Sequence, residues 1–197
     1  YMHKYGATSE HFGWVAVTLR ENASRNPRAL RRDPITLADH QNSRMVVDPL
    51  HLLDICQEND GAAAIVMTTP DRAKKLRHAD TLTLVEATAQ GSGPSNEGVI
   101  YRPDISVAES TNTARDLWAR AKVGPSDIDA LMFYDHFTPF CLFNLEAYGF
   151  VPFGEAKDFV SGGQNIRFDG MLPINTHGGN HSEAYIHGLT HTQEAVR

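Results

Sequence analysis

The chain has 197 residues, of which 41% are hydrophobic and 21% charged, and its formal net charge is −6. This composition is close to the globular average, which excludes disordered, collagen-like and coiled-coil chains. No apolar run approaches the roughly 20 residues that a membrane-spanning helix needs. The mild negative charge gives no electrostatic reason to expect nucleic acid as a partner. The two cysteines lie in apolar stretches, which favours a cytoplasmic protein over a disulfide scaffold.

The first part of the chain is predicted to hold helices and one central strand. Apolar residues at helical spacing indicate a helix over residues 7–24, and a shorter helix is expected over residues 36–41. An Asp-Pro pair is typical of a helix start, so the residues after it, 50–56, are predicted as a short apolar helix. The next apolar run, residues 62–68, has the length of a strand and no polar face. Such a run is typical of a central strand that is buried on both faces.

Helices and strands continue to alternate in the rest of the chain. A short basic helix that ends at His78 is followed by a strand over residues 81–88 and by a linker rich in Gly, Ser and Pro over residues 91–98. An amphipathic helix is predicted over residues 105–123. The remaining predicted elements are a strand over 128–133, a helix over 137–148, a loop over 151–170 and a last helix over 183–197. This alternation predicts the α/β class with layered sheets.

Tyr134, Asp135 and His136 stand where a buried strand is predicted to end and a helix to begin. Polar side chains at the carboxyl end of such a strand point into the crevice in which α/β proteins bind ligands. Tyr134 can hold or exchange a proton, and Asp135 can accept hydrogen bonds. The same residues also fit an ordinary helix start, with Asp135 as the cap and His136 partly exposed in the first turn. The residues alone leave both interpretations open.

A second polar motif begins at Asn175 and contains a glycine pair. Gly178 and Gly179 let the backbone approach a ligand closely or adopt positive φ. Tyr185 and His187 follow at the entrance to a predicted helix, whose free N–H groups suit an anionic or oxyanionic partner. An ordinary glycine turn with a helix cap explains the same pattern, so this motif by itself does not establish a site.

The sequence carries no strong metal or nucleotide signature. His187 and His191 have the spacing of two ligands on one helix face, but no cysteine lies nearby and no HExxH pattern exists, so we expect no metal. The sequence contains no Walker loop, no GxGxxG after a strand and no GxSxG elbow. Cys56 and Cys141 are predicted to lie in helices on apolar faces and to fill the core rather than act as nucleophiles.

Several short motifs occur in a fixed order along essentially the whole chain. They are the segments 1–10, 26–27, 43–45, 48–50, 60–63, 134–137 and 175–188. Together they resemble the thiolase superfamily, in its branch around sterol carrier protein x and bacterial lipid-transfer proteins. The resemblance implies the layered αβαβα thiolase fold. Residues 1–78 would complete the first half of that fold, and residues 79–197 would form the second half.

The ends of the chain agree with a piece of a longer subunit. The chain starts at Tyr1 rather than at a methionine, and Arg197 lies inside a predicted helix. The resemblance implies that the N-terminal part of the family, with its nucleophilic cysteine, is not in this sequence. It also implies that the C-terminal acid/base cysteine lies beyond Arg197, and that the protein is a homodimer.

Tyr134 and Tyr185 are the main departure from thiolases. The resemblance places them where thiolases hold the thioester oxygen of the substrate in an oxyanion hole, with an Asn or His and with the histidine of a Gly-His-Pro motif. Two tyrosines argue against ordinary thiolysis. They resemble instead the lipid-transfer-protein aldolases of bacterial steroid side-chain breakdown. That resemblance implies retro-aldol cleavage of a β-hydroxyacyl-CoA to a ketone and propionyl-CoA, a small OB-fold partner protein, and no cofactor besides the CoA of the substrate.

The chemistry of that reaction suits a pair of phenols. Retro-aldol cleavage needs a base for the β-hydroxyl proton and a donor that holds and then protonates the thioester enolate, and it needs no covalent acyl-enzyme. A phenol can do either once neighbours tune its pKa, which is about 10 when unperturbed. We therefore predict that Tyr134 and Tyr185 share these roles. The predicted supporting residues are Asp135, His136 and His187, and the predicted substrate-binding residues are Asn175, Gly178 and Gly179.

Other functions remain open on the sequence. A thiolase-type acyltransferase would use a cysteine from the part of the subunit that this sequence lacks. A carrier of acyl-CoA or lipid would keep the thiolase scaffold without catalysis, and an inactive subunit paired with an active homologue would do the same.

Overall fold

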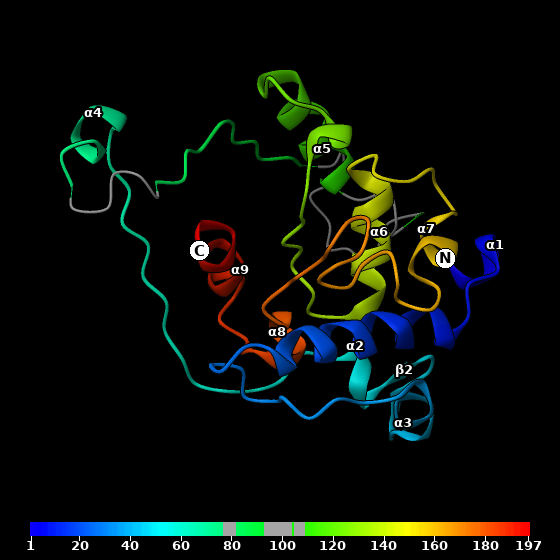
Figure 1. Cartoon of the computed structure of the whole chain (residues 1–197). Coiled ribbons are helices and arrows are strands. Elements are labelled where there is room, and N and C mark those ends of the chain that lie inside the picture. Colours follow the sequence, from blue (N-terminus) through cyan, green and yellow to red (C-terminus); the bar gives the residue numbers. More distant parts are fainter. Residues whose placement is uncertain (77–81, 93–103, 105–108) are drawn as a thin grey trace.

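The computed structural model describes residues 1–76, 82–92, 104 and 109–197. Figure 1 shows the arrangement of the elements. The helices are α1 (Met2–Tyr5), α2 (Ser9–Ser24), α3 (Leu37–Asn42), α4 (Pro70–Ala73), α5 (Glu109–Arg120), α6 (Thr138–Ala147), α7 (Ala156–Val160), α8 (Gly179–Ser182) and α9 (Leu189–Val196), with 3-10 turns η1 (Leu52–Asp54) and η4 (Pro125–Asp127) and strands β1 (Met45–Val47) and β2 (Leu50–His51). None of the helices in the described part is long and apolar enough to cross a bilayer.

The core forms where α2 packs against α6, α7 and α8 (Figure 1). Val15 and Leu19 of α2 and Leu142 and Leu145 of α6 have no exposed surface. Burying a leucine side chain in this way stabilises a fold by about 1.5–3 kcal/mol. The packing of these two helices therefore holds α6, which directly follows the segment that carries Tyr134.

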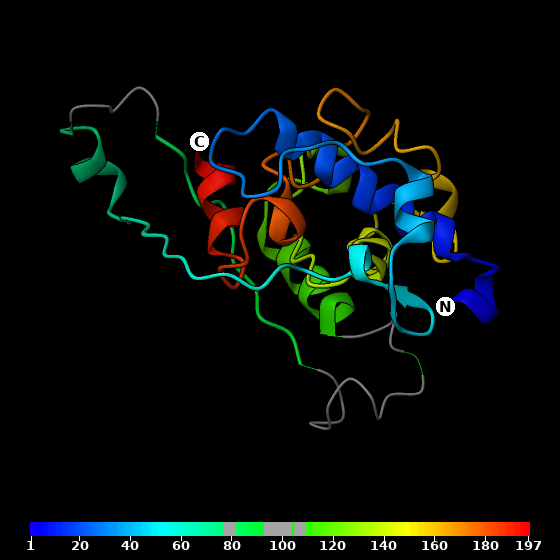
Figure 2. The ribbon, with the colours of Figure 1, turned by 90° about the horizontal axis from the view of Figure 1, so that it is seen from below.

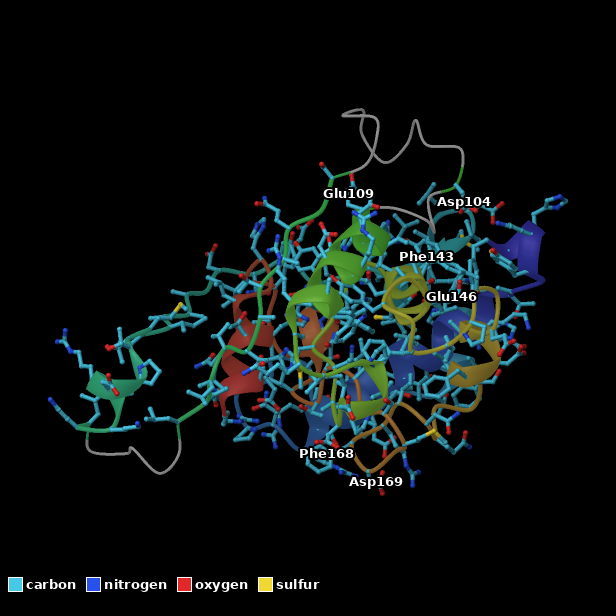
Figure 3. All side chains as sticks on the ribbon, turned by 90° about the horizontal axis from the view of Figure 1, so that it is seen from above. Asp104, Glu109, Phe143, Glu146, Phe168 and Asp169 are labelled. Atoms are coloured by element: carbon cyan, nitrogen blue, oxygen red, sulfur yellow. The ribbon has the colours of Figure 1, made fainter. Side chains whose placement is uncertain are left out.

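Helix α6 lies in the interior of the molecule and includes a buried glutamate. Figure 3 shows Phe143 and Glu146 of this helix within the body of the molecule, whereas Phe168 and Asp169 lie on an outer loop. Glu146 is buried because its carboxylate accepts hydrogen bonds from the Tyr1 hydroxyl and from the Ala156 N–H, the latter at 3.1 Å. The charge of this buried carboxylate is thus compensated by donors from α7 and from the first residue of the chain.

Helices with strong local signals form as the sequence predicts. The helix expected over 7–24 is α2, with Thr8 as its N-cap, and the helix expected over 36–41 is α3. The helix expected over 137–148 is α6, and the amphipathic helix expected over 105–123 is α5 in its described part, whereas residues 105–108 lie outside the described residues. These helices carry their own capping and periodicity signals, so local sequence suffices to place them.

The helix predicted over residues 50–56 is wrong. The chain instead forms an antiparallel hairpin of β1 and β2, with the cis Asp48–Pro49 peptide in its turn, followed by the single turn η1. The Asp54 carboxylate accepts a hydrogen bond from the His51 N–H at 2.8 Å, which closes this turn. An Asp-Pro pair is also a turn signal, and here the turn prevails over the helix start.

The strands predicted over 62–68 and 81–88 do not form in the described residues. Val66 is 92% exposed and Leu84 is 72% exposed. Figures 1 and 2 show these stretches running away from the helical body to α4 and back. A strand buried on both faces needs neighbouring strands and covering helices, and the described part of the chain offers none beside them. The end of the basic helix at His78, residue 81, and most of the predicted linker lie outside the described residues.

Two further expectations need correction nearer the C-terminus. The strand predicted over 128–133 is reduced to one parallel bridge between Leu131 and Ile174. The loop predicted over 151–170 contains α7. The last helix begins only at α9, because His187 and Gly188 have φ of 46° and 78°, which no α-helix accommodates.

Candidate active site

Tyr134 and Tyr185 come into direct contact although they are 51 positions apart in the sequence. Their hydroxyl oxygens are 2.8 Å apart and their ring centres 6.3 Å apart, and both side chains are partly buried. The backbone N–H of Tyr185 donates to Oδ1 of Asn59 at 2.8 Å, which fixes the loop between α8 and α9. The ring of Tyr134 lies against Gly188, where an added Cβ would be 3.0 Å from its Cδ2. Each phenol is thus held by a different part of the chain.

The environment of Tyr134 favours its neutral form. Burial raises the pKa of this phenol, and the hydrogen bond with Tyr185 and the nearby Cys56 thiol and Asp135 carboxylate raise it further. A phenol with a raised pKa keeps its proton at neutral pH and can donate it.

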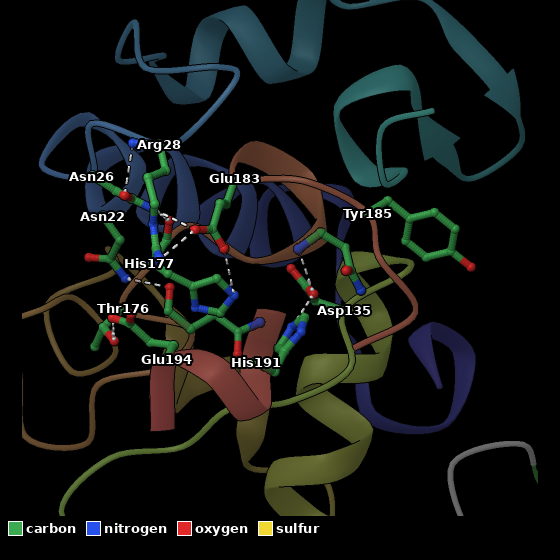
Figure 4. A network of polar contacts seen from close by, with 12 residues as sticks. Asn22, Asn26, Arg28, Asp135, Thr176, His177, Glu183, Tyr185, His191 and Glu194 are labelled. Atoms are coloured by element: carbon green, nitrogen blue, oxygen red, sulfur yellow. Dashed lines mark hydrogen bonds and ion pairs between the residues drawn. The ribbon is translucent and has the colours of Figure 1, made fainter. Parts of the chain in front are cut away.

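Asp135, the residue after Tyr134, has no exposed surface. Its Oδ1 accepts a hydrogen bond from Nε2 of His191 at 2.8 Å and from the N–H of Asn180 at 3.0 Å (Figure 4). Burial by itself would raise the pKa of this carboxyl, but these two hydrogen bonds and the nearby His181 lower it overall. The group is therefore a buried carboxylate that serves as an acceptor. Gly179 is needed beneath it, because a Cβ there would collide with Oδ2.

The two predicted supporting histidines flank the tyrosines. The ring of His136 lies 5.1 Å from that of Tyr134 and 4.3 Å from that of Phe140. Burial lowers the pKa of His136, so this side chain is neutral at neutral pH. His187 is exposed and its ring lies 4.9 Å from that of Tyr185. Both histidines are thus in ring contact with a phenol.

The predicted substrate-binding residues serve to pack chain segments together. The side-chain amide of Asn175 accepts from the N–H of Phe133 at 2.8 Å and donates to its carbonyl at 2.9 Å. Gly178, with φ of 105°, packs on Ala23 of α2, where a Cβ would be 2.5 Å from the alanine methyl. These contacts hold the segment that leads into Tyr134. A direct contact with substrate stays a prediction for all three residues.

Sequence reasoning missed His191 as a partner of the site. It noted His191 only for its spacing from His187, yet His191 is buried against Asp135 while His187 is exposed. No local pattern links positions 135 and 191, so only the fold could show this contact. Among the described residues, no group of three or more His, Cys, Asp or Glu side chains is arranged to hold a metal ion.

The two cysteines have different surroundings, and both are free. Cys141 is fully buried in α6, as predicted. Cys56 was expected in a helix but lies after η1 outside any helix, where its N–H donates to the carbonyl of His136 at 3.0 Å. Burial raises the pKa of the Cys56 thiol, so the group is protonated at neutral pH although it lies near the phenols.

Comparison with known proteins defines the family. The family model described as thiolase C-terminal domain-like matches residues 91–197. A steroid side-chain-cleaving aldolase of Thermomonospora curvata is 50% identical, over 100% of this chain and 51% of its own. A 17-hydroxy-3-oxo-4-pregnene-20-carboxyl-CoA lyase of Mycobacterium tuberculosis is 48% identical over the same shares. An acetyl-CoA acetyltransferase of Methanothermobacter thermautotrophicus is 37% identical, over 100% of this chain and 50% of its own.

A solved structure agrees with these matches. The Ltp2-ChsH2(DUF35) aldolase superposes with a TM-score of 0.89 and 48% identity, over 100% of this chain and 52% of that chain. The chain therefore belongs to the thiolase C-terminal domain-like family and has a thiolase-like fold, which confirms the predicted family and fold class. It spans about half the length of the curated relatives it matches. The predicted division of the chain between residues 78 and 79 stays a prediction.

Proposed function

We propose that the protein to which this chain belongs is a retro-aldolase that cleaves a β-hydroxyacyl-CoA thioester, with Tyr134 and Tyr185 as its acid–base pair. The observation that carries the proposal is the 2.8 Å contact between the two hydroxyl oxygens. The names of the relatives at 50% and 48% identity, an aldolase and a CoA lyase, support the class of reaction. The predicted supporting and substrate-binding residues belong to the same proposal.

The proposed reaction balances without an added reagent. The base takes the proton of the β-hydroxyl, and the electrons of that O–H bond form the carbonyl of the ketone. The bond between Cα and Cβ breaks, and its electrons become the thioester enolate. The donor delivers a proton to Cα as the enolate charge develops, which gives propionyl-CoA. Nothing is oxidised or reduced overall, so the proposal includes no cofactor besides the CoA of the substrate.

We assign the donor role to Tyr134 and the base role to Tyr185. Burial raises the pKa of Tyr134, and the Asp135 carboxylate next to it opposes loss of its proton. As Tyr134 gives its proton to Cα, the proton of Tyr185 moves along the hydrogen bond to Tyr134, and Tyr185 takes the β-hydroxyl proton in the same step, so both phenols end neutral. A contact of 2.8 Å is the ordinary length of a bond between hydroxyl groups, so the pair can relay a proton without rearrangement.

The finer parts of the proposal concern substrate, partners and location. We propose a steroid side chain as the acyl group, as in the name of the M. tuberculosis relative. We also propose a homodimer with a small OB-fold partner, which the two-part name of the Ltp2-ChsH2(DUF35) aldolase supports as far as a partner is concerned. The two free cysteines support a cytoplasmic location.

The test uses the complete gene product, co-expressed with its partner protein. It is incubated with 17-hydroxy-3-oxo-4-pregnene-20-carboxyl-CoA, and the products are identified by mass spectrometry. A ketone plus propionyl-CoA is the expected result. Absence of cleavage by the complete, folded assembly would reject the proposal.

A thiolase-type acyltransferase is the second candidate, because one relative at 37% identity is an acetyl-CoA acetyltransferase. This candidate predicts that a β-ketoacyl-CoA and free CoA give a shortened acyl-CoA. Binding of CoA thioesters without turnover in either assay would point instead to a carrier or an inactive subunit.

A further inference from the structure

One buried carboxylate ties together the two chain segments that carry the phenols. Asp135 directly follows Tyr134 in the sequence. Its Oδ1 accepts from the Asn180 N–H in α8 and from Nε2 of His191 in α9 (Figure 4). Tyr185 lies in the loop between these two helices. Through these two hydrogen bonds, Asp135, the neighbour of Tyr134, is joined to both ends of the loop that carries Tyr185.

Asp135 and His191 are both buried and closely packed. Asp135 has no exposed surface, and Gly179 leaves no room for a side chain beneath its Oδ2. His191 is 4% exposed, and its ring stands edge-on to that of His177 with the centres 4.8 Å apart. Because an ionised carboxylate only accepts hydrogen bonds, Nε2 of His191 carries the proton of this contact. The donor is thus packed against the segment that leads into α8.

The contact between the phenols depends on this placement. An O–H···O bond is effective only over about 2.5–3.0 Å, and the hydroxyl oxygens of Tyr134 and Tyr185 are 2.8 Å apart. A shift of one segment by about 1 Å breaks such a contact, and misplacement of this size costs an enzyme up to about a hundredfold in rate. His191 touches neither hydroxyl, so it acts on the reaction only by holding Tyr134 in place, through its hydrogen bond to Asp135 and through a ring contact with Tyr134, whose centre lies 6.4 Å from its own.

We propose that His191 is a positioning residue for the retro-aldol reaction: its hydrogen bond to Asp135 keeps Tyr134 and Tyr185 in contact. This inference rests on the proposed function. His191 does not face the CoA thioester in this account. Its loss therefore lowers kcat and leaves KM nearly unchanged.

A second buried histidine provides a matched control. His40 of α3 has no exposed surface, and its Nε2 lies 2.7 Å from Oδ1 of Asp54. This contact is as short and as buried as that of His191, but Asp54 is not adjacent to either tyrosine, and its hydrogen bond from the Thr138 hydroxyl at 2.6 Å does not involve His40. Replacement of His40 therefore removes a buried histidine–carboxylate contact and leaves the hydrogen bonds of Asp135 with Asn180 and His191 intact.

The experiment compares four variants of the complete protein with its partner. His191→Gln places an amide nitrogen near the original Nε2 and keeps the donor, whereas His191→Asn, one methylene shorter, does not reach Asp135. His191→Leu removes the donor altogether, and His40→Leu is the control. We expect kcat to fall roughly tenfold to a hundredfold in His191→Asn and His191→Leu. We expect His191→Gln to recover most of it, and His40→Leu to lose melting temperature but not kcat.

A second readout does not depend on turnover. Tyrosines labelled at Cζ are titrated by NMR, and the Tyr134 resonance is assigned from Tyr134→Phe. Loss of the hydrogen bond to Tyr185 removes one cause of the raised pKa of Tyr134. This phenol should therefore titrate at lower pH in His191→Asn than in the wild type and in His191→Gln.

Each outcome bears on one claim. Equal losses of kcat in His191→Asn and in His40→Leu, or an unchanged Tyr134 titration in His191→Asn, overturn the positioning role. A wild-type protein that cleaves no β-hydroxyacyl-CoA overturns the proposed function instead. In that case the titration still decides whether His191 holds the two phenols together. His191→Asn retains a polar side chain, so the comparison survives if His191→Leu does not fold.

Discussion

The hydroxyl contact between Tyr134 and Tyr185 is 2.8 Å long, and the proposed reaction needs both hydroxyl groups. Tyr134→Phe and Tyr185→Phe each remove one hydroxyl and leave the ring. We expect kcat/KM to fall about 100-fold or more in each, the usual contribution of a positioned acid or base. The double variant should lose little more than either single one, because the groups act as a unit. Full activity in a single variant, measured with the complete protein, would remove that residue from the mechanism.

Cys56 is a thiol near the phenol pair that the proposed reaction does not use. The thiol lies near Tyr134, and burial raises its pKa, so it is a poor nucleophile at neutral pH. We expect Cys56→Ser to keep kcat within about threefold of the wild type, since the proposed cleavage has no acyl-enzyme step. Loss of turnover in a Cys56→Ser protein with an unchanged melting temperature would contradict this.

His177 makes the stability of the fold depend on pH. Burial, with smaller effects of His191 and of the nearby Arg28 and Arg197, lowers the pKa of His177 to about 3, although Asp135 opposes the shift. Below about pH 6.5 the unfolded chain binds a proton at this residue and the folded chain does not, so stability falls as the pH drops. Between pH 7 and pH 5 this residue costs about 2 kcal/mol. Urea unfolding of His177→Phe, which cannot titrate, should show a correspondingly weaker loss.

The residue before α9 lies directly against the ring of Tyr134. Gly188 has φ of 78°, and a Cβ there would be 3.0 Å from Cδ2 of Tyr134. Gly188→Ala should therefore reduce kcat by displacing the phenol, in addition to a strain of about 1 kcal/mol. Gly149 at the end of α6 also has φ of 78°, but the nearest atom to an added Cβ is Pro125 Cγ at 3.8 Å.

Gly149→Ala is thus the matched control for α9. Both variants should lose similar amounts of stability in urea unfolding, and only Gly188→Ala should lose kcat. A similar drop of kcat in both would show that the start of α9 does not position Tyr134.

Local signals predicted some elements and failed for others. Helix α2 carries its own cap and periodicity, and α6 has Pro139 in its first turn and a positive-φ glycine after its end, so both follow from the sequence. Strands depend on partners that a local pattern does not contain. The apolar run around Val66, for example, lies exposed in the described part of the chain. The hairpin of β1 and β2 was missed because an Asp-Pro pair serves turns as well as helix starts.

The candidate site shows the same limit. The two tyrosines emerged from family resemblance together with the chemistry of phenols, and the fold brings them into contact. The Asp135–His191 contact joins residues 56 positions apart and has no sequence signal. The side-chain bonds of Asn175 to Phe133 likewise depend on tertiary packing.

At the scale of the whole molecule, the phenols are held by segments from distant parts of the chain. Asn59 holds the backbone of Tyr185, the Leu131–Ile174 bridge holds the segment before Tyr134, and α8 and α9 hold Asp135. The hydrophobic core between α2 and α6 includes Leu131 and Ile174, so it packs against the segment before Tyr134. Since the chain spans about half the length of its curated relatives, catalysis is to be measured on the complete protein.

The most direct test of the central claim is the cleavage reaction carried out in D2O. The complete protein and its partner receive a β-hydroxyacyl-CoA with a steroid side chain, and the CoA product is weighed by mass spectrometry. Protonation of an enolate by the phenol pair predicts propionyl-CoA with one deuterium at C2, formed without free CoA and lost in Tyr134→Phe. A shortened acyl-CoA that forms only from a β-ketoacyl-CoA with added CoA would contradict the account and establish a thiolase.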